Sequence, residues 1–196
     1  MEAVFKPYPG GRPTHAPADA ALALVRKHEL KVEDIERVIL RTSPPATAAH
    51  YSKPYKVGEY PTGDALFNYR YSVATALARG RVTNENFTEE SIRDPRVQTL
   101  IAKMELAELS RERGVELEVQ LKSGRNLVEY VPVALGEPAN PLSRDQLVAK
   151  FMTQVDFSRL IARAEAEKLV ALLDRLEDVE DVTRIVELAV RRDKTS

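Results

Sequence analysis

Lys6 and His15, near the start of the chain, have side chains suited to acid–base chemistry. They belong to a segment of eleven residues, 5–15, that contains three prolines and two glycines; we call it the Pro/Gly segment. This composition argues against a helix or a central strand, because proline lacks the amide donor that both require. We therefore predict a stiff, extended loop that carries Lys6 and His15 to the start of a helix.

The Pro/Gly segment also has an interpretation without function. In that interpretation Lys6 is simply solvated, and His15 merely lies near a helix N-terminus. The residue types alone do not choose between the two, because a loop motif indicates chemistry only once its geometry is known.

The composition limits the class of protein. The 196 residues include 29 Lys and Arg against 30 Asp and Glu, a net charge of −1, and the charges are interspersed. We therefore expect no nucleic acid and no anionic membrane as partner. No apolar run approaches the ~20 residues of a membrane span, and no signal-peptide pattern is present, so a cytoplasmic location is expected.

Motifs for metals and cofactors are absent from the sequence. The chain has no cysteine, and its three histidines, His15, His28 and His50, are isolated from one another. It also lacks a phosphate-binding loop, a dinucleotide-binding glycine pattern and a serine nucleophile motif. We therefore predict neither a metal nor an organic cofactor. Proton transfer by lysine, histidine, tyrosine or carboxylate side chains is the chemistry that the sequence leaves.

Hydrophobic periodicity predicts the elements that must position these side chains. A helix is expected from Pro17 to about Leu30, with Thr14 as its candidate cap and Asp19 able to face water. Residues 35–42 alternate in the manner of a half-buried strand. The Pro/Gly segment would thus lead directly into the first helix.

A second helix is predicted from Asp64 to Arg79, ending at Gly80. A helical turn at 46–51 and an irregular loop at 52–63 precede it. Tyr71 lies on one of its two apolar stripes. The Tyr71 hydroxyl could serve a site, but a tyrosine in this position is commonly a core residue with its hydroxyl satisfied.

The middle of the chain carries the β signal. Residues 115–121 and 128–131 alternate between apolar and polar around a Ser-Gly-Arg-Asn turn, which predicts an antiparallel hairpin with one dry face. A further strand is expected at 104–109, after short helices that begin near Thr88 and Asp94.

A break at residues 136–141 precedes three amphipathic helices, the first capped by Ser143. Strands confined to the middle, with helices before and after, predict an α+β fold in which a small antiparallel or mixed sheet packs with helices. We predict an α+β domain at residues 1–141 and a C-terminal helical segment at 142–196.

Three blocks of sequence carry a family resemblance. The first combines residues 6–9 (Lys-Pro-Tyr-Pro) with residues 14–20, which include Thr-His and Asp-Ala. The second covers residues 65–80, and the third covers residues 136–143 (Gly-Glu-Pro-Ala-Asn-Pro-Leu-Ser). In this order and spacing, the chain resembles the C-terminal half of the MmgE/PrpD family. That family includes 2-methylcitrate dehydratase, cis-aconitate decarboxylase and iminodisuccinate epimerase.

The resemblance implies a lid-type α+β domain over the active site of a two-domain enzyme, with residues 142–196 returning to a helical domain. It implies a lyase or isomerase that needs no cofactor, acting by dehydration, decarboxylation or epimerisation on a small di- or tricarboxylate. The expected partners are that substrate, an N-terminal helical domain in cis or trans, and a second copy of the chain in a homo-oligomer such as a homodimer. Without the helical domain, the chain would be inactive.

The same resemblance implies roles for individual residues. Lys6 would bind a substrate carboxylate, His15 would move a proton or orient the substrate, and Tyr71 would donate a hydrogen bond to a leaving hydroxyl or a developing oxyanion. Arg12 and Arg70 are further candidates for binding the substrate, with a solvated position as the alternative for each.

A second class of function stays open on the sequence. The C-terminal helices are amphipathic, and the chain offers their apolar faces no obvious partner. Those faces could drive dimerisation or docking in a non-catalytic interaction or ligand-binding module.

Overall fold

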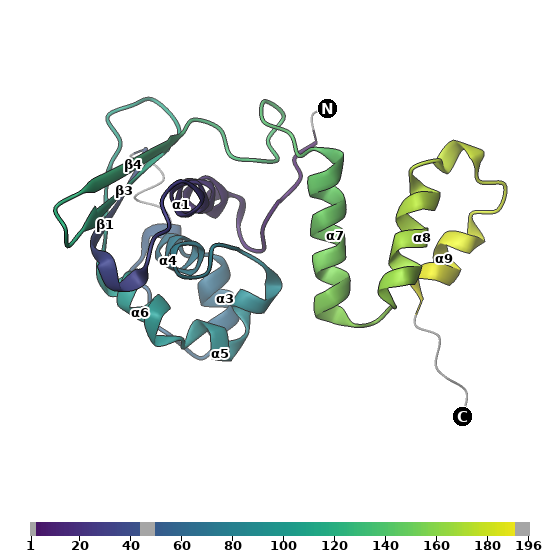
Figure 1. Cartoon of the computed structure of the whole chain (residues 1–196), viewed down its shortest axis with the longest axis horizontal. Helices are drawn as coiled ribbons and strands as arrows, with labels where there is room; N and C mark the ends of the chain where they lie inside the picture. The colour runs from purple at the N-terminus through teal and green to yellow at the C-terminus, as the bar shows by residue number, and fades with distance from the viewer. Residues whose placement is uncertain (1–2, 44–49, 191–196) are drawn as a thin grey trace. The chain divides into compact units, whose positions relative to one another are not determined.

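The computed structural model describes residues 3–43 and 50–190. The chain forms two compact units, residues 1–142 and residues 143–196. The first unit combines a four-stranded sheet with helices, and the second unit is helical (Figure 1). The fold is therefore α+β with a mixed sheet followed by helices, as the sequence predicts.

The sheet has the strand order β2-β1-β3-β4. The strand β1 (Ile35–Thr42) pairs antiparallel with β3 (Val115–Leu121), which pairs antiparallel with β4 (Asn126–Val131). The short β2 (Met104–Glu108) runs parallel to β1 and makes the sheet mixed. The predicted strand at 35–42 and the predicted hairpin are confirmed.

One face of the sheet forms the main core. Val38, Leu40, Leu117 and Val119 are fully buried there, because alternate residues of a strand point to the same side. The helix α1 (His15–Lys27) packs on β3 and β4, and α4 (Tyr69–Arg79) packs beside α1 (Figure 1). The helix α6 (Pro95–Ala102) contacts both α4 and β1.

The opposite face of the sheet carries charges that pair across strands. The Arg41 guanidinium lies 3.2 Å from a Glu116 carboxylate oxygen and 2.8 Å from a Glu118 oxygen. Arg37 of β1 pairs with Glu105 of β2. This face therefore needs no second layer of helices.

Shorter elements connect the core helices of the first unit. They are the 3₁₀ helices η1 (Arg12–Thr14), η2 (Val32–Asp34), η3 (His50–Ser52) and η4 (Asn84–Phe87) and the α-helices α3 (Pro61–Leu66) and α5 (Glu89–Ile92). The helical turn predicted at 46–51 falls mostly outside the described residues.

The single helix predicted from Asp64 to Arg79 is wrong. The chain forms α3 and α4 instead, and Asn68 separates them as the N-cap of α4. The Asn68 side-chain oxygen accepts hydrogen bonds from the amides of Arg70 and Tyr71. An asparagine in this position competes with the helical backbone for hydrogen bonds, and the apolar stripes conceal this break. Gly80 ends α4 at φ +65°, as predicted.

The first helix also differs from its prediction. It begins at His15, two residues before Pro17, and ends at Lys27. Thr14 precedes it, but the Thr14 hydroxyl donates to the carbonyl of Gly11 at 2.8 Å and does not cap the helix. The extended loop predicted for residues 5–15 is therefore wrong in its last part, because Arg12–Thr14 form η1 and His15 is the first residue of α1.

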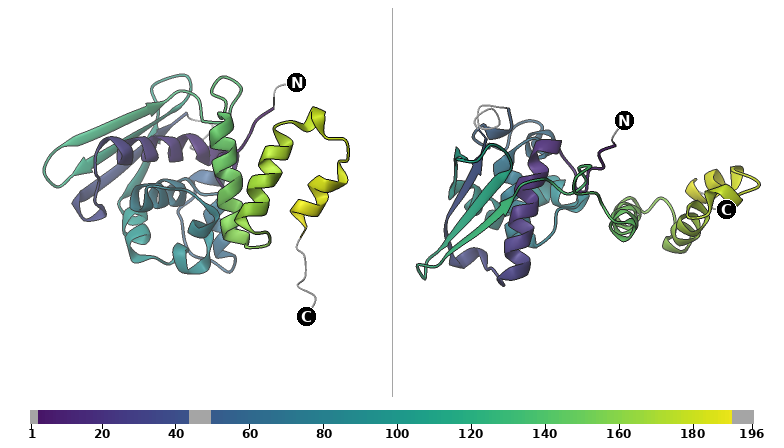
Figure 2. Two further views of the ribbon diagram at one scale, coloured as in Figure 1. Left: turned by 45° about the vertical axis from the view of Figure 1, so that its right-hand side comes forward. Right: turned by 90° about the horizontal axis from the view of Figure 1, so that it is seen from above.

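The second unit contains α7 (Arg144–Ser158), α8 (Arg163–Leu173), η5 (Leu176–Asp178) and α9 (Thr183–Ala189) (Figure 2). As predicted, Ser143 caps the first of these helices, in a capping box with Gln146. The α7 helix packs on α8, which packs on α9. The small core of this unit is built around Met152, Val155 and Ala166.

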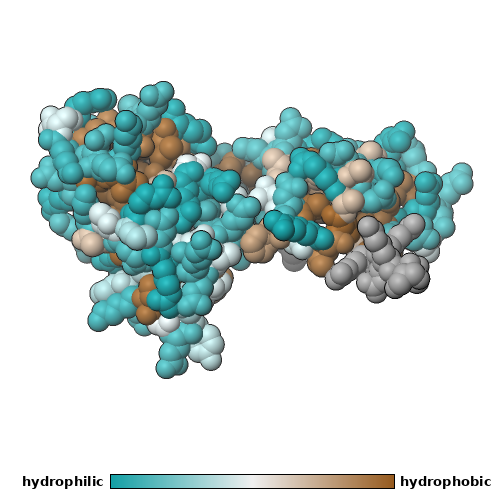
Figure 3. Space-filling view, turned by 60° about the horizontal axis from the view of Figure 1, so that its bottom comes forward, coloured by the Kyte–Doolittle hydropathy of each residue, from teal (hydrophilic) through white to brown (hydrophobic). Residues whose placement is uncertain are grey.

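Large apolar side chains are exposed in this second unit. Val182 and Val186 are each 61% exposed, and Leu160 is 57% exposed. Figure 3 shows brown, hydrophobic residues between hydrophilic ones on the face in view. Over the described ranges, no helix combines the length and the apolar character needed to cross a bilayer.

Candidate active site

The two glycines of the Pro/Gly segment let it lie against the end of α3. The amide of Gly11 donates to the carbonyl of Leu66 at 2.9 Å. Gly10 has φ +108°, and a Cβ there would lie 2.6 Å from that same carbonyl oxygen. A Cβ on Gly11 would lie 2.5 Å from the ring of Tyr51. The close approach therefore requires both glycines.

The other side of the Pro/Gly segment is fastened to the 136–141 break. The Phe5 amide donates to the Gly136 carbonyl at 3.0 Å. Arg12, a predicted substrate ligand, lies 3.2 Å from a carboxylate oxygen of Glu137. In this arrangement, Arg12 helps to hold the segment, and a substrate carboxylate would have to compete with Glu137 for it.

Lys6 lies on the exposed part of the Pro/Gly segment. Its ammonium group donates to the Gly10 carbonyl at 3.1 Å, which folds the side chain back along its own loop. Among the described residues, no acidic side chain forms an ion pair with Lys6. An ammonium group has three donors, so this lysine retains the capacity to bind an anion.

His15 is enclosed at the start of α1, where it is only 1% exposed. The ring of Tyr8 packs against the imidazole edge-to-face, with ring centroids 5.7 Å apart and an interplanar angle of 82°. Such contacts favour one relative orientation of the two rings. The Pro/Gly segment thus folds its own tyrosine over the histidine that follows it.

The hydroxyl of Tyr8 donates to Asp19 Oδ1 at 2.6 Å. The second oxygen of Asp19 accepts the amide of Leu135 at 2.8 Å. Burial raises the pKa of the Asp19 carboxyl above its usual value, and burial followed by the Asp19 charge raises the pKa of Tyr8. The prediction that Asp19 faces water is therefore wrong, because its carboxylate is half-buried and joins three segments of the chain.

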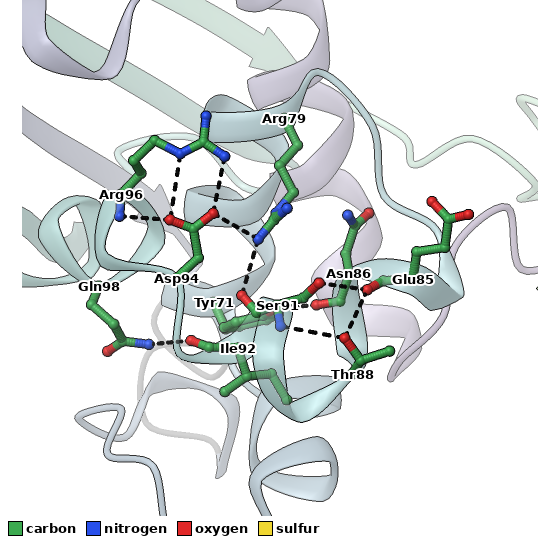
Figure 4. Close-up of polar contacts among 10 residues, drawn as sticks. All are labelled: Tyr71, Arg79, Glu85, Asn86, Thr88, Ser91, Ile92, Asp94, Arg96 and Gln98. Carbon is green, nitrogen blue, oxygen red and sulfur yellow. Dashed lines mark hydrogen bonds and ion pairs between the residues drawn. The ribbon is translucent and has the colours of Figure 1, made fainter.

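Tyr71 lies in the core of the first unit. The residue is 0% exposed, and its hydroxyl donates to the backbone carbonyl of Asn86 (Figure 4). Its ring packs against those of Tyr55 and Phe87, at centroid distances of 5.5 and 5.4 Å. Burial raises the pKa of Tyr71 to about 12, so the phenol stays protonated near neutral pH and keeps its hydrogen-bond donor.

A network of charged groups lies at the C-terminal end of α4 (Figure 4). Arg79 donates to the Ser91 carbonyl at 3.1 Å and pairs with Asp94 at 2.9 Å. Asp94 also pairs with Arg96 at 3.0 Å, and the hydrogen bonds from Arg96 lower the pKa of the Asp94 carboxyl. These contacts are internal, and they fix α4, α5 and α6 to one another.

Arg70, the other predicted substrate ligand, is held by backbone carbonyls. Its guanidinium donates to the carbonyl of Ser52 at 2.7 Å and to that of Lys53 at 3.2 Å. Burial lowers the pKa of Arg70. In this position Arg70 orders the loop that follows η3.

The structure thus brings some of the predicted site residues together and separates others. Lys6, Arg12 and His15 share the fastened Pro/Gly segment. Tyr71 belongs to α4 and not to this segment. Its neighbour Ser72 donates to the Thr14 carbonyl at 3.1 Å. The Tyr71 side chain contacts Tyr55, Asn86 and Phe87 instead.

Sequence reasoning missed the part played by Tyr8, Asp19 and Glu137. One signal was available for Asp19: it follows His15 by four residues, which places the two side chains on one face of a helix. Nothing local in the sequence indicates the contacts made by Leu135 and Glu137. Within the described ranges, no three His, Asp or Glu side chains are grouped closely enough to hold a metal ion.

The comparison with protein families decides the classification. A family model, the MmgE/PrpD C-terminal domain, matches residues 8–183. The chain belongs to the MmgE/PrpD family. The resemblance carried by the three sequence blocks is therefore confirmed, and the match covers the α+β unit and most of the C-terminal helices. It includes Tyr8, Arg12, His15 and Tyr71, and begins two residues after Lys6.

A curated relative agrees with this membership of the MmgE/PrpD family. Cis-aconitate decarboxylase of the mouse (Mus musculus) is 28% identical to the chain over 201 residues. The aligned region covers 96% of this chain and 39% of the mouse protein. The chain thus spans about two fifths of the length of this relative.

Proposed function

We propose that this chain is the C-terminal part of an MmgE/PrpD enzyme that moves a proton next to a carboxylate of a small di- or tricarboxylate. The reaction would be a dehydration, a decarboxylation or an epimerisation, carried out without a metal or organic cofactor. Family membership supports the class of enzyme. The name of the mouse relative, a decarboxylase, supports a lyase.

The observation that carries the proposal is the placement of Lys6. Its ammonium group is exposed on a segment that is fastened to α3 and to the 136–141 break, and no described acid neutralises it. A cation on a rigid support binds a carboxylate without first losing much conformational entropy. We therefore assign Lys6 to binding a substrate carboxylate.

His15 and Tyr71 have enclosed side chains, so a substrate must gain access to them before they can act. His15 would transfer a proton or orient the substrate, and Tyr71 would donate a hydrogen bond to a developing oxyanion. Both roles need access that this chain, taken alone, does not give. We propose that docking of a helical domain, in cis or in trans, completes the site and gives a substrate access to these two side chains.

The test is a complementation assay. The chain is mixed with, or fused to, the N-terminal helical part of a family member, and small di- and tricarboxylates that include cis-aconitate are followed by NMR in D₂O. Deuterium incorporation next to a carboxylate, or loss of water or CO₂, is the expected result. The chain alone should show none of these. Failure of every complemented pair to exchange or convert any substrate would overturn the proposal.

Matched variants separate the residue roles in this assay. Lys6→Ala should raise KM for the carboxylate, and His15→Ala should lower kcat. The controls are Lys122→Ala and His50→Gln, which change exposed residues of the same types outside the candidate site. If Lys6→Ala and His15→Ala leave the activity at the level of these controls, the assignment of roles is wrong.

A second candidate function rests on the C-terminal helices. Val182 and Val186 are exposed there. A cavity of about 400 Å³ in the same unit is lined by Leu160, Ile161, Leu188 and Val190 among others. We propose that this surface joins two copies of the chain. Light scattering after size exclusion should show a dimer that Val182→Ser with Val186→Ser converts to monomer. A monomeric parent chain would count against this candidate.

A further inference from the structure

Tyr8 occupies the centre of the contacts around His15. Its ring packs on the imidazole, and its hydroxyl donates to Asp19 at 2.6 Å. It lies two residues after Lys6 in the same segment. The Tyr8 side chain thus connects His15, the loop that carries Lys6, and Asp19 of α1.

Asp19 extends these contacts to a third part of the chain. On α1 it follows His15 by four residues, the spacing at which two helical side chains are neighbours. One carboxylate oxygen accepts the Tyr8 hydroxyl, and the other accepts the amide of Leu135, just before the 136–141 break. Both oxygens are therefore used, and the Tyr8 hydroxyl has one defined acceptor.

We infer that Tyr8 and Asp19 are positioning residues, which set the orientation of the His15 imidazole and the path of the loop that bears Lys6. Asp19 fixes the hydroxyl of Tyr8, and the ring of Tyr8 fixes the imidazole. The effect of these two residues on catalysis rests on the proposed function. The structural part of the inference, the coupling of Tyr8 and Asp19 to His15, does not depend on any activity.

The burial of Asp19 makes its position depend on its hydrogen-bond partners. Its carboxylate is half-buried, and no ion pair of Asp19 is found in the described part of the chain; the charge of Arg26 acts on it, but more weakly than burial does. Removing a charge from water without a cation in direct contact opposes folding. The hydrogen bonds from the Tyr8 hydroxyl and the Leu135 amide offset part of this cost, so the position of the carboxylate depends on these two contacts.

The first test is a spectroscopic one on the whole 196-residue chain. Only three histidines are present, so the imidazole signals of His15 can be assigned with His28→Gln and His50→Gln. Tyr8→Phe removes only the hydroxyl and Asp19→Ala removes its acceptor. Both should shift the His15 signals in the same direction. Tyr130→Phe is the control, because its exposed hydroxyl donates to the Arg113 carbonyl outside the site.

The same variants form a double-mutant cycle. Both variants break the hydrogen bond from Tyr8 to Asp19, and Asp19→Ala also releases the Leu135 amide. The double variant should therefore shift the His15 signals no further than Asp19→Ala alone does. Asp19→Asn should restore part of the parent position, because its amide group can still form hydrogen bonds with the Tyr8 hydroxyl and the Leu135 amide. Unchanged His15 signals in Tyr8→Phe, or fully additive shifts, would overturn the inference.

The catalytic consequence is measured on the complemented enzyme. Tyr8→Phe and Asp19→Ala should each lower kcat about tenfold, the size of a net hydrogen-bond contribution to a charged group, with a smaller change in KM. Tyr130→Phe should keep the parent kcat. An inactive parent enzyme would reject the proposed function. The spectroscopic result would still test the coupling of Tyr8 and Asp19 to His15. An active parent with unchanged kcat in Tyr8→Phe would reject the positioning role alone.

Discussion

Gly136 lies directly against the backbone of Phe5. The Phe5 amide donates to the Gly136 carbonyl at 3.0 Å, and a Cβ on Gly136 would overlap the carbonyl oxygen of Phe5. Two residues from opposite ends of the first unit are thus in van der Waals contact, and no side chain can be placed between them. This contact holds the start of the Pro/Gly segment in place.

Gly136→Ala should therefore destabilise the first unit and release the Pro/Gly segment. We expect a loss of about 2–4 kcal/mol, from the strain of a positive φ and from the overlap with Phe5. The measurement is denaturant unfolding combined with limited proteolysis of residues 5–15. Gly124→Ala is the matched control, because Gly124 has φ +84° but a Cβ added there would meet no atom within 4 Å. Equal losses in the two variants would show that the Phe5 contact has no effect on stability.

Tyr71→Phe should lower the free energy of unfolding by about 1–3 kcal/mol, because the buried Asn86 carbonyl loses its donor. Tyr130→Phe should change it by less than about 0.5 kcal/mol, since the Tyr130 hydroxyl is exposed and water can replace it. Urea unfolding of both variants measures the difference. A neutral Tyr71→Phe would contradict a structural role for the hydroxyl and would favour a role in the site alone.

The stability of the protein should depend on the ionisation of Asp19. Its folded-state pKa is raised by burial, so its contribution to stability is present below the unfolded pKa of 3.8 and is lost as the pH rises through the folded value. Asp19→Asn cannot ionise. The free energy of unfolding of this variant should therefore increase relative to the parent between about pH 4 and pH 7.

Asp94→Asn gives the opposite control for that experiment. The hydrogen bonds from Arg96 lower the pKa of Asp94, so its contribution is lost only as the pH falls through a value below 3.8. The stability difference between Asp94→Asn and the parent should stay constant above about pH 5. If the Asp19→Asn difference is constant over the same range, the carboxylate of Asp19 is not desolvated as described.

Arg70→Met should loosen the loop after η3. The guanidinium of Arg70 holds the carbonyls of Ser52 and Lys53, and we expect their release to cost about 1–3 kcal/mol. Hydrogen exchange of residues 50–56 should become faster, and Arg70→Lys should restore little, because an ammonium group cannot replace the planar fork. Unchanged exchange combined with a raised KM in the complemented enzyme would instead support substrate binding by Arg70.

Local patterns in the sequence predicted much of the fold. The strand at 35–42 and the hairpin were predicted because alternation of apolar and polar residues has a period of two in any half-buried strand. Gly80 and Ser143 were identified as helix ends because their capping chemistry is local. The break at Asn68 was missed, because a side chain that caps a helix in the middle of an apolar pattern does not interrupt that pattern.

For the candidate site too, the sequence indicates only those features that depend on local composition. The Pro/Gly segment, with Lys6, Arg12 and His15, was recognised from composition because proline and glycine restrict the backbone locally. The sequence did not indicate the hydrogen bond from Tyr8 to Asp19 or the pairing of Arg12 with Glu137. They join positions that are far apart in the sequence or that belong to elements whose orientation the sequence does not give.

By itself, the sequence determined the α+β class, the family, and the presence of a Pro/Gly-rich segment that carries a lysine and leads into a helix. Only the tertiary structure decided that His15 and Tyr71 are enclosed, that Asp19 is half-buried, and that Gly136 holds Phe5. The physical reason is that secondary structure follows from local periodicity and backbone restriction. Burial and pairing depend instead on which distant surfaces the packed core brings together.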